Sequence, residues 1–522
     1  MMTMNVLMIA FGFILVLAIL DLWIGVTNDA VNFINSAVGS RIAKRKTILM
    51  IASVGVVFGA LFSSGMMEVA RKGVFDVGAF YDGAGQLNIT AIMCVYLGVM
   101  TADVIMLDLF NTFGLPTSTT VSIVSELVGA SIAVAFWMGG GDFGAALEII
   151  NSGPVLGIYT GIFLSVLVAF FSAAALKFLL RLIFTHDLAR TFPTRGWLWT
   201  GLCFGALAYF VLFKGLKSAS FLAGDTKTMI QDNIWLIMAG VFVLSGIFSI
   251  IFAKKHELIF KVIILASTCA LAMAFAGNDL VNFIGPTVAA GQAVFVEGVQ
   301  LSGKVKTPEW ALILAGGVMV FALWRSKKAK AVTDTEVRLA AAGPMKQRFK
   351  STPFARFVVK ASNNSFTIAR YLLPASIRGI ANRRTVPLQN GADTPAYDLL
   401  RASVNLTLAS ILISIGTSFK LPLSTTYISF MVAMGASLAD RTWDAESAEG
   451  RVTGMLAVIG GWLLTGILAA SGAFVTASIL YKLSLGWGIL VLAGIMLFLL
   501  IKSSASHNKM FSGRENVMDQ VA

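Results

Sequence analysis

The chain has 522 residues, of which 57% are hydrophobic and 13% are charged, and its formal net charge is +13. A soluble protein of this length would need far more charge to cover its surface, so the composition excludes a soluble globular protein. The charge is concentrated in residues 326–397, where thirteen Lys and Arg stand against three acidic residues. Because cytoplasmic loops of membrane proteins have this composition, we expect no nucleic-acid partner.

Apolar stretches long enough to cross a bilayer, roughly 20 residues each, recur along the chain. They are residues 4–25, 47–67, 88–110, 157–180, 234–253, 258–276, 311–324, 403–417, 455–480 and 485–501. The first has no basic n-region or cleavage site, which favours a retained helix over a signal peptide. We predict an all-α polytopic membrane protein with about ten to twelve transmembrane segments, some of them broken or re-entrant, in the cell (inner) membrane.

Two motifs occur twice. Asn-Asp-x-Val-Asn-Phe-Ile stands at residues 28–34 and again 250 residues later, at 278–284. Leu-Pro-x-Ser-Thr-Thr stands at residues 115–120 and again 306 residues later, at 421–426, and Gly-Ala-Ser follows both copies at the same distance. The basic stretch that lies between the motifs of the second half accounts for the larger offset. The sequence therefore predicts two homologous halves.

Charge indicates how the two halves are oriented. Residues 41–46, after the first Asn-Asp motif, carry four basic residues and no acid, whereas their counterpart, 291–309, carries two of each sign. Residues 68–86 carry three acids against two bases, whereas their counterpart is the basic stretch. Because the basic sides are exchanged, the positive-inside rule predicts an inverted repeat with an external amino terminus and a cytoplasmic basic loop.

The predicted organisation has six parts. They are 1–145, the first repeat; 146–253, connecting transmembrane helices; 254–325, the second repeat's first part; 326–397, the basic cytoplasmic loop; 398–445, the second repeat's second part; and 446–522, terminal helices and a tail.

The Asn-Asp motif predicts a cation site. A carboxylate such as Asp29 costs roughly 2.5–3.5 kcal/mol at membrane depth and is rarely kept without a partner. We expect a helix break near residues 25–28 that frees backbone carbonyls beside Asn28, giving oxygen ligands suited to sodium. A capped helix terminus would explain one copy. The second copy, Asn278 and Asp279, favours a coupling cation.

The Leu-Pro-x-Ser-Thr-Thr motif predicts an oxyanion site. Proline ends one helix and suits the first turn of the next, so the hydroxyls that follow lie among free N–H groups at a helix N-terminus. Such donors bind oxyanions, and the helix dipole contributes about half a positive charge. Hydroxyl caps of ordinary helices are the alternative. The predicted substrate-binding residues are Ser118, Thr119, Thr120, Ser424, Thr425 and Thr426, with Asn32 and Asn282 one turn after the aspartates.

Charge balance connects the two predicted sites. A dianion would be repelled by two aspartates in the membrane unless cations entered with it, so coupled transport is expected. Two further acids are left open. Glu126 has no repeat partner, since Val432 stands at its counterpart, and it is either a proton site or internally paired. Asp108 is near enough in sequence to the Ser118 motif to border the same cavity.

The paired motifs resemble those of the inorganic phosphate transporter (PiT) family of secondary carriers. The matching segments are 25–40, 59–76, 114–120, 276–283 and 421–426. The resemblance implies cation-coupled phosphate import, the paired binding residues named above, and a homodimer. The family often has histidine after Ser-Thr-Thr, where this chain has Val121 and Tyr427. The coupling cation therefore stays open between Na⁺ and H⁺.

The alternatives are a sulfate or other oxyanion permease of the same fold, an oxyanion channel, or an intramembrane enzyme. An enzyme has little support, because the chain lacks His-Glu-x-x-His, Gly-x-Ser-x-Gly and any Cys/His cluster. We expect no cofactor and no catalytic residue. The partners that the sequence predicts are inorganic phosphate and the lipid bilayer.

Overall fold

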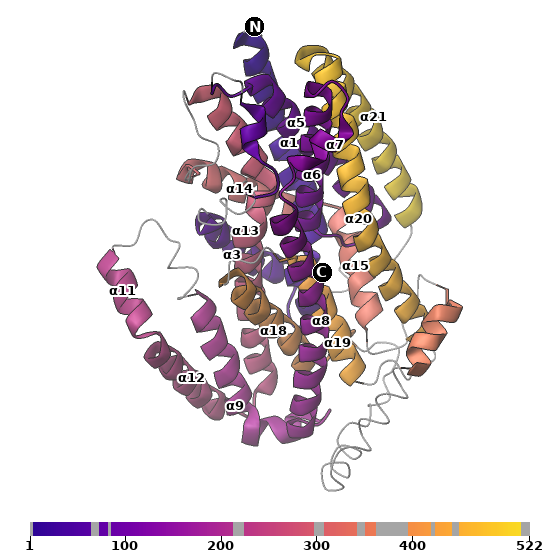
Figure 1. Ribbon diagram of the computed structural model, residues 1–522. Coiled ribbons are helices and arrows are strands. Elements are labelled where there is room, and N and C mark those ends of the chain that lie inside the picture. Colours follow the sequence, from indigo (N-terminus) through magenta and orange to yellow (C-terminus); the bar gives the residue numbers. More distant parts are fainter. Residues whose placement is uncertain are drawn as a thin grey trace.

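The computed structural model of this chain describes residues 4–63, 73–81, 85–211, 224–296, 307–341, 350–361, 395–418, 423–440 and 448–512. Within these ranges the protein is helical and contains no strand beyond isolated bridges (Figure 1). The elements are α1 Met4–Asp29, α2 Val31–Gly39, α3 Arg45–Leu61, η2 Val77–Phe80, α5 Ile89–Phe113, α6 Thr119–Met138, α7 Phe143–Glu148, α8 Ser152–Ile183, α9 Leu188–Tyr209, α11 Gly224–Asp232, α12 Ile234–Ile251, α13 His256–Phe295, α14 Glu309–Arg325, α15 Lys328–Ala340, α18 Leu399–Ser418, α19 Thr425–Ala439, α20 Ala448–Lys482 and α21 Leu485–Phe511.

The length and composition of these helices confirm a polytopic membrane protein. Nine helical spans of the described residues are long and apolar enough to cross a membrane, or ten if α14 and α15, bent by 71°, form one broken span. Nine spans fall one short of the expected ten to twelve, and ten spans lie at the lower edge of that range. Large apolar side chains are exposed on the outer helices, including Phe171 on α8 and Leu244 on α12, as lipid-facing positions require.

The Asn-Asp motifs lie within long helices. The predicted break near residues 25–28 is wrong, because the helix continues through it, with the Ala30 N–H donating to Val26 O at 2.9 Å. A single residue separates α1 from α2. The second motif lies within α13, which is 40 residues long and is not interrupted there. Gly25 is explained by packing: a Cβ there would lie 2.1 Å from Cε1 of Phe283. The glycine admits a ring from the other half.

The true interruptions precede the two Ser-Thr-Thr segments. α5 ends at Phe113, Gly114 adopts a left-handed conformation with φ of 63°, and α6 begins only at Thr119. α19 has 15 residues, which rise roughly 22 Å, less than the hydrocarbon core of about 30 Å. The prediction of broken or re-entrant helices is confirmed by the bend between α14 and α15. The chain is also non-helical directly before Thr119 and Thr425, at residues 115–118 and 423–424, and it does not break near residues 25–28.

Each Ser-Thr-Thr helix is supported by one long helix. α6 packs against α20, and α19 packs against α8. The glycines of the two Gly-Ala-Ser segments make both contacts possible, because a Cβ on Gly129 would lie 2.0 Å from Ala470 O and one on Gly435 would lie 2.1 Å from Phe170 O. The glycine of the Gly-Ala-Ser segment therefore allows the same kind of close helix contact in both repeats.

Part of the basic stretch is packed helix. α15 contacts α1, α2 and α5, and its Thr333 and Glu336 are fully buried. Lys328 forms an ion pair with Asp108 of α5, with 2.5 Å between Nζ and Oδ1. A count of charges does not reveal that Lys328 is paired. Residues 328–340, which were expected to belong to a solvated loop, therefore form a packed helix. Residues 342–349 and 362–394 of this stretch lie outside the described residues.

Candidate oxyanion and cation site

Four helices meet at a buried polar centre formed by the two repeated motifs. The N-termini of α6 and α19 approach the junction of α1 with α2 and the middle of α13. Asp29 and Asp279 are both fully buried there and interact electrostatically with each other. Within the described residues neither aspartate forms an ion pair with a basic side chain. The two negative charges therefore rely on hydroxyl and amide donors.

Asp29 receives hydroxyl groups from both halves. Thr426 Oγ1 donates to Oδ1 at 2.8 Å, and Thr119 Oγ1 donates to Oδ2 at 3.3 Å. The amide of Asn32 donates to Asp29 Oδ1 at 3.4 Å and to Thr426 Oγ1 at 3.0 Å. It also reaches Thr425 Oγ1 at 3.4 Å. Asn32 therefore connects its own aspartate to the threonines of the opposite half.

Asp279 repeats this arrangement with the halves exchanged. Thr425 Oγ1 donates to Oδ2 at 2.6 Å, and Thr120 Oγ1 donates to Oδ1 at 3.4 Å. The amide of Asn282 donates to Asp279 Oδ1 at 3.2 Å, to Thr120 Oγ1 at 3.2 Å and to Thr119 Oγ1 at 3.4 Å. Each aspartate thus accepts one threonine hydroxyl from each half, and each asparagine contacts both threonines of the opposite half.

The two serines of the motifs have a different role from the threonines. Ser118 Oγ accepts from the Val121 N–H at 3.2 Å, and Ser424 Oγ accepts from the Tyr427 N–H at 3.1 Å. Both serines are N-caps, which is the ordinary use of a hydroxyl at this position. They shape the helix ends, while the threonines bring their hydroxyls to the aspartates.

The leading asparagines hold the turns before the Ser-Thr-Thr helices. Asn28 Nδ2 donates to Asn111 Oδ1 at 2.8 Å and to Leu115 O at 3.1 Å, and its Oδ1 accepts from the Thr117 N–H at 2.8 Å. In this way Asn28 fastens the first proline turn to α1.

Asn278 has one contact of the same kind and one directed at the aspartates. Its Nδ2 donates to Leu423 O at 3.2 Å and to Asp279 Oδ1 at 3.0 Å. Asn28 and Asn278 therefore fasten the residues before the two Ser-Thr-Thr helices to the Asn-Asp helices.

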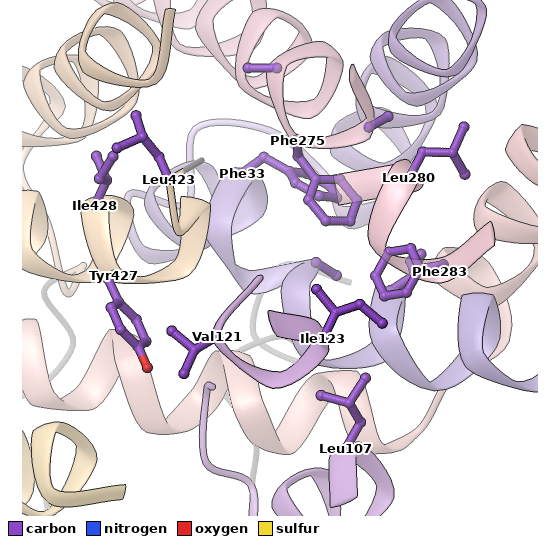
Figure 2. Close-up of a cluster of buried hydrophobic side chains, with 14 of the residues drawn as sticks. Phe33, Leu107, Val121, Ile123, Phe275, Leu280, Phe283, Leu423, Tyr427 and Ile428 are labelled. Carbon is purple, nitrogen blue, oxygen red and sulfur yellow. The ribbon is translucent and has the colours of Figure 1, made fainter. Parts of the chain in front are cut away.

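Apolar side chains from both halves surround these polar groups. Figure 2 shows Phe33, Phe283, Val121 and Tyr427, which are motif residues or directly follow a motif, around the region where the helices meet. Phe33 packs on Phe275, with 5.3 Å between ring centroids. The low polarity strengthens every electrostatic interaction in the centre, because water does not screen it.

The donor set defines which ligand chemistry fits. Carboxylate, amide and hydroxyl oxygens are hard ligands that suit Na⁺ and not a thiophilic metal. In the part of the chain that the structure describes, no group of three or more His, Cys, Asp or Glu residues could hold a metal ion. The hydroxyls, amide N–H groups and two helix N-termini are in turn donors for an oxyanion.

Trp462 of α20 packs against the site, although it belongs to neither of the repeated motifs. Its ring stacks on Tyr427 with 3.8 Å between centroids, and its Nε1 donates to Pro116 O at 3.3 Å. One turn later, Thr465 forms a hydrogen bond of 2.7 Å with Thr117. α20 therefore contacts the proline turn of one half and the residue after Ser-Thr-Thr of the other, which sequence inspection did not predict.

The two acids left open by the sequence lie outside this centre. Asp108 does not contact the site threonines; it pairs with Lys328 and accepts a hydrogen bond from Ser503. Glu126 is fully buried and accepts from Ser122 Oγ at 2.7 Å.

Comparison with known proteins gives consistent results. The sequence model of the phosphate transporter family matches residues 25–328. A Pyrococcus abyssi protein whose name describes a phosphate permease is 28% identical over 310 residues, covering 58% of this chain and 71% of that protein. A Haemophilus influenzae protein named in the same way is 24% identical over 322 residues, covering 59% and 73%. A solved structure described as the sodium-dependent phosphate transporter has the same fold, with a TM-score of 0.62 at 17% identity, over 92% of this chain and 100% of that one.

Proposed function

Because this chain belongs to the phosphate transporter family, we propose that it is a cation-coupled secondary transporter that imports inorganic phosphate across the cell membrane. The observation that carries the proposal is the joining of two Ser-Thr-Thr helix N-termini around one pair of buried aspartates. Transporters place substrate and coupling ions at such repeat interfaces, at the ends of interrupted helices.

The anion is proposed to bind between the N-termini of α6 and α19. Each helix end contributes about half a positive charge, so two facing ends supply about one. The hydroxyls of Thr119, Thr120, Thr425 and Thr426 add neutral donors, and Asn32 and Asn282 add amide N–H groups. A tetrahedral oxyanion has enough acceptor oxygens to use donors from both halves. Ser118 and Ser424 contribute by fixing the helix ends.

The coupling is proposed to arise from competition for the threonine hydrogens. A hydroxyl has one hydrogen. In this structure Thr119, Thr425 and Thr426 direct it at Asp29 or Asp279, whereas Thr120 shares its hydrogen between Leu423 O at 3.1 Å and Asp279 Oδ1 at 3.4 Å. A cation bound to these carboxylates would take over their lone pairs and release the hydroxyls to the anion. It would also cancel the negative charge that repels the anion. Cation binding therefore prepares the anion site both chemically and electrostatically.

The cation ligands are proposed to be Asp29, Asp279 and Asn278. Asn28 belongs to the same motif, but its amide is already used by Asn111, Leu115 and Thr117. We therefore assign Asn28 a positioning role beside the cation and not direct coordination.

The inverted repeat is part of the proposal and is supported by helix directions. α3 and α14 follow the Asn-Asp motifs in the two halves, and they lie antiparallel. Trp324 donates to Ser53 Oγ at 2.9 Å near one end, and Gly316 lies against Ala60 further along. α1 and α13 are also antiparallel, since Phe11 packs on Phe295 and Gly25 packs on Phe283.

Uptake of radiolabelled phosphate into proteoliposomes under imposed Na⁺ or H⁺ gradients tests the proposal. We expect phosphate to accumulate only while a cation gradient lasts, with labelled sulfate as the competing substrate. Preference for sulfate would support the alternative oxyanion permease. Flux that ignores both cation gradients would indicate a channel and would contradict coupled transport.

A further inference from the structure

A second buried polar cluster lies in the first half, away from the threonines. Asp21 of α1, Asp103 of α5, and Ser122 and Glu126 of α6 are all 0% exposed. Ser122 Oγ lies 2.6 Å from Asp103 Oδ1 and 2.7 Å from Glu126 Oε1. Asp21 reaches the cluster from a third helix and interacts electrostatically with Asp103, and neither of its oxygens accepts a hydrogen bond from any described donor.

The hydrogens in this cluster can be counted. Ser122 has one hydroxyl hydrogen, so it can donate to only one of its two carboxyl neighbours. The other contact needs a hydrogen that comes from the carboxyl group itself. Asp21 adds a third buried carboxyl group near Asp103, and two ionised carboxylates repel each other. The geometry therefore fits carboxyl groups that hold protons.

No positive charge offsets the cluster. Among the described residues, no Lys, Arg or His hydrogen-bonds to or pairs with Asp21, Asp103 or Glu126. Three ionised carboxylates buried together without a counter-charge would cost many kcal/mol, and such groups take up protons instead. The other titratable groups facing the cluster are Asp29, further along α1, and Tyr159 of α8, which interacts with Glu126; neither supplies positive charge.

The cluster breaks the symmetry of the two repeats. At the motif offsets of 250 and 306 residues, every member has an apolar counterpart in the second half. The counterparts are Leu271, Ala409, Ile428 and Val432. The two halves thus share the paired aspartates of the transport site but not this cluster. Four positions on three helices are polar together in one half and apolar together in the other, which indicates that they act as one unit.

We propose that Asp21, Asp103, Ser122 and Glu126 form a proton-binding site, present once in each chain. A proton fits better than a metal ion because Ser122 Oγ lies within hydrogen-bond distance of two carboxyl oxygens. Among the described residues no group of three or more His, Cys, Asp or Glu could hold a metal ion. The site is separate from the paired-aspartate centre, and Asp21 is near enough to Asp29 to interact with it electrostatically.

The bound proton holds three helices together. Its release would leave like charges between α1, α5 and α6, and these helices carry Asp29 and the threonines of the first half. Release becomes favourable as pH rises, so alkaline conditions would loosen the first half and leave the second unchanged. This consequence for uptake rests on the proposed transport function, whereas proton binding itself does not.

Infrared difference spectroscopy of the full-length protein in lipid tests the site without a transport assay. The wild type should show a protonated carboxyl band that shifts in heavy water, and Glu126→Gln should lose part of it. A variant carrying the second half's side chains, Asp21→Leu, Asp103→Ala, Ser122→Ile and Glu126→Val, should lose the same component and stay packed. Asp108→Asn is the matched control, because Asp108 lies outside the cluster and forms an ion pair with Lys328, and this variant should keep the band.

Two results would overturn the proposal. One is an unchanged carboxyl band in both cluster variants. The other is a response of the wild-type carboxylate bands to added Na⁺ that the four-residue variant loses, since this would assign a metal cation to the cluster.

In proteoliposomes, the fall of phosphate uptake at alkaline pH should be lost in Glu126→Gln. Failure of phosphate uptake in the wild type would contradict the transport proposal and leave the infrared result standing.

Discussion

At the residue scale, the centre depends on side chains that each have one hydrogen to give. Threonine serves better than lysine or arginine at this depth, because a hydroxyl can turn from carboxylate to anion without carrying a charge through the membrane. Asp29 and Asp279 accept hydrogen bonds from the site threonines. In the proposed mechanism, a cation on these carboxylates would release the threonine hydroxyls to the anion.

Asp29→Asn and Asp279→Asn should each abolish cation-driven accumulation of phosphate. The amide keeps the shape and most hydrogen bonds of the carboxylate but removes the charge that holds the cation. Loss of one charged ligand, about 1.5–3 kcal/mol, should weaken apparent cation affinity roughly 10- to 100-fold. The measurement is uptake against cation concentration, with Asp108→Asn as the control outside the site. Unchanged cation dependence in both variants would contradict the assignment.

Thr425→Val and Thr119→Val should weaken phosphate binding more than cation binding. Valine keeps the volume but removes one donor worth about 0.5–1.5 kcal/mol, so KM for phosphate should rise roughly 2- to 10-fold. Thr425→Ser and Thr119→Ser are matched controls that retain the hydroxyl. If the serine variants lose as much affinity as the valine variants, the hydroxyl is not the reason.

At the element scale, interrupted helices and close helix contacts create the site. α6 and α19 begin inside the bundle after non-helical residues, and Gly129 and Gly435 bring α20 and α8 close to them. Only Ala30 separates α1 from α2 in the first motif, and α13 is continuous through the second. Phe283 of α13 packs directly on Gly25 of α1. The aspartates are therefore presented by rigid helix and the donors by helix ends.

Gly25→Ala should disturb the contact between α1 and α13. The new Cβ would overlap the Phe283 ring, which lies 2.1 Å from the ideal position, and such overpacking costs about 1–3 kcal/mol. We expect a lower Tm in detergent and reduced uptake. Phe283→Leu in the same chain should restore part of both by making room. A Tm equal to that of the wild type in the single variant would show that the helices can separate without cost.

At the scale of the whole molecule, a buried ionic network fastens the second half. Arg181 of α8 pairs with Asp398 and with Asp440, the latter at 2.9 Å, and Lys177 reaches both carboxylates at 3.3 and 3.5 Å. Asp398 precedes α18 and Asp440 caps the end of α19. The network therefore joins three helices at the end of α19 opposite its threonines.

Arg181→Met should destabilise this connection by about 3–5 kcal/mol, because it leaves the buried Asp440 and the partly exposed Asp398 with fewer partners. The readout is Tm by fluorescence in detergent. Arg338→Ala is the matched control: its pair with Asp334 is partly exposed, and such surface pairs contribute about 0–1 kcal/mol. Equal changes in the two variants would contradict a special role for the buried network.

The proposed inverted repeat predicts that α3 and α14 begin on opposite sides of the membrane. Lys44→Cys, directly before α3, should react with an impermeant thiol reagent only from the cytoplasm, and Glu309→Cys, at the start of α14, only from outside. Cys94 and Cys203 are buried, and Cys269 can be replaced by serine to lower the background. Labelling of both positions from the same side would exclude inversion.

The expected homodimer can be tested in the same preparation by crosslinking.

The sequence by itself determined the class of protein, the repeated motifs and the types of residue that form the site. Hydropathy determined this because backbone groups in lipid must be satisfied within helices. The repeated motifs indicated the site residues, because a single polar residue in a helix can have many structural roles. The same polar residues at matched positions in two halves have few such roles. Asp29 with Asp279, and the two Ser-Thr-Thr segments, could be chosen without coordinates.

Only the tertiary structure decided which groups meet. It showed that the helix does not break at residues 25–28, that the serines are caps, that Asn28 is used by a proline turn, and that Trp462 contacts both halves. It also gathered Asp21, Asp103 and Glu126, which no local pattern connects. The physical reason is that hydrogen-bond partners and close packing are set by side chains from distant segments, and these leave no periodicity in the sequence.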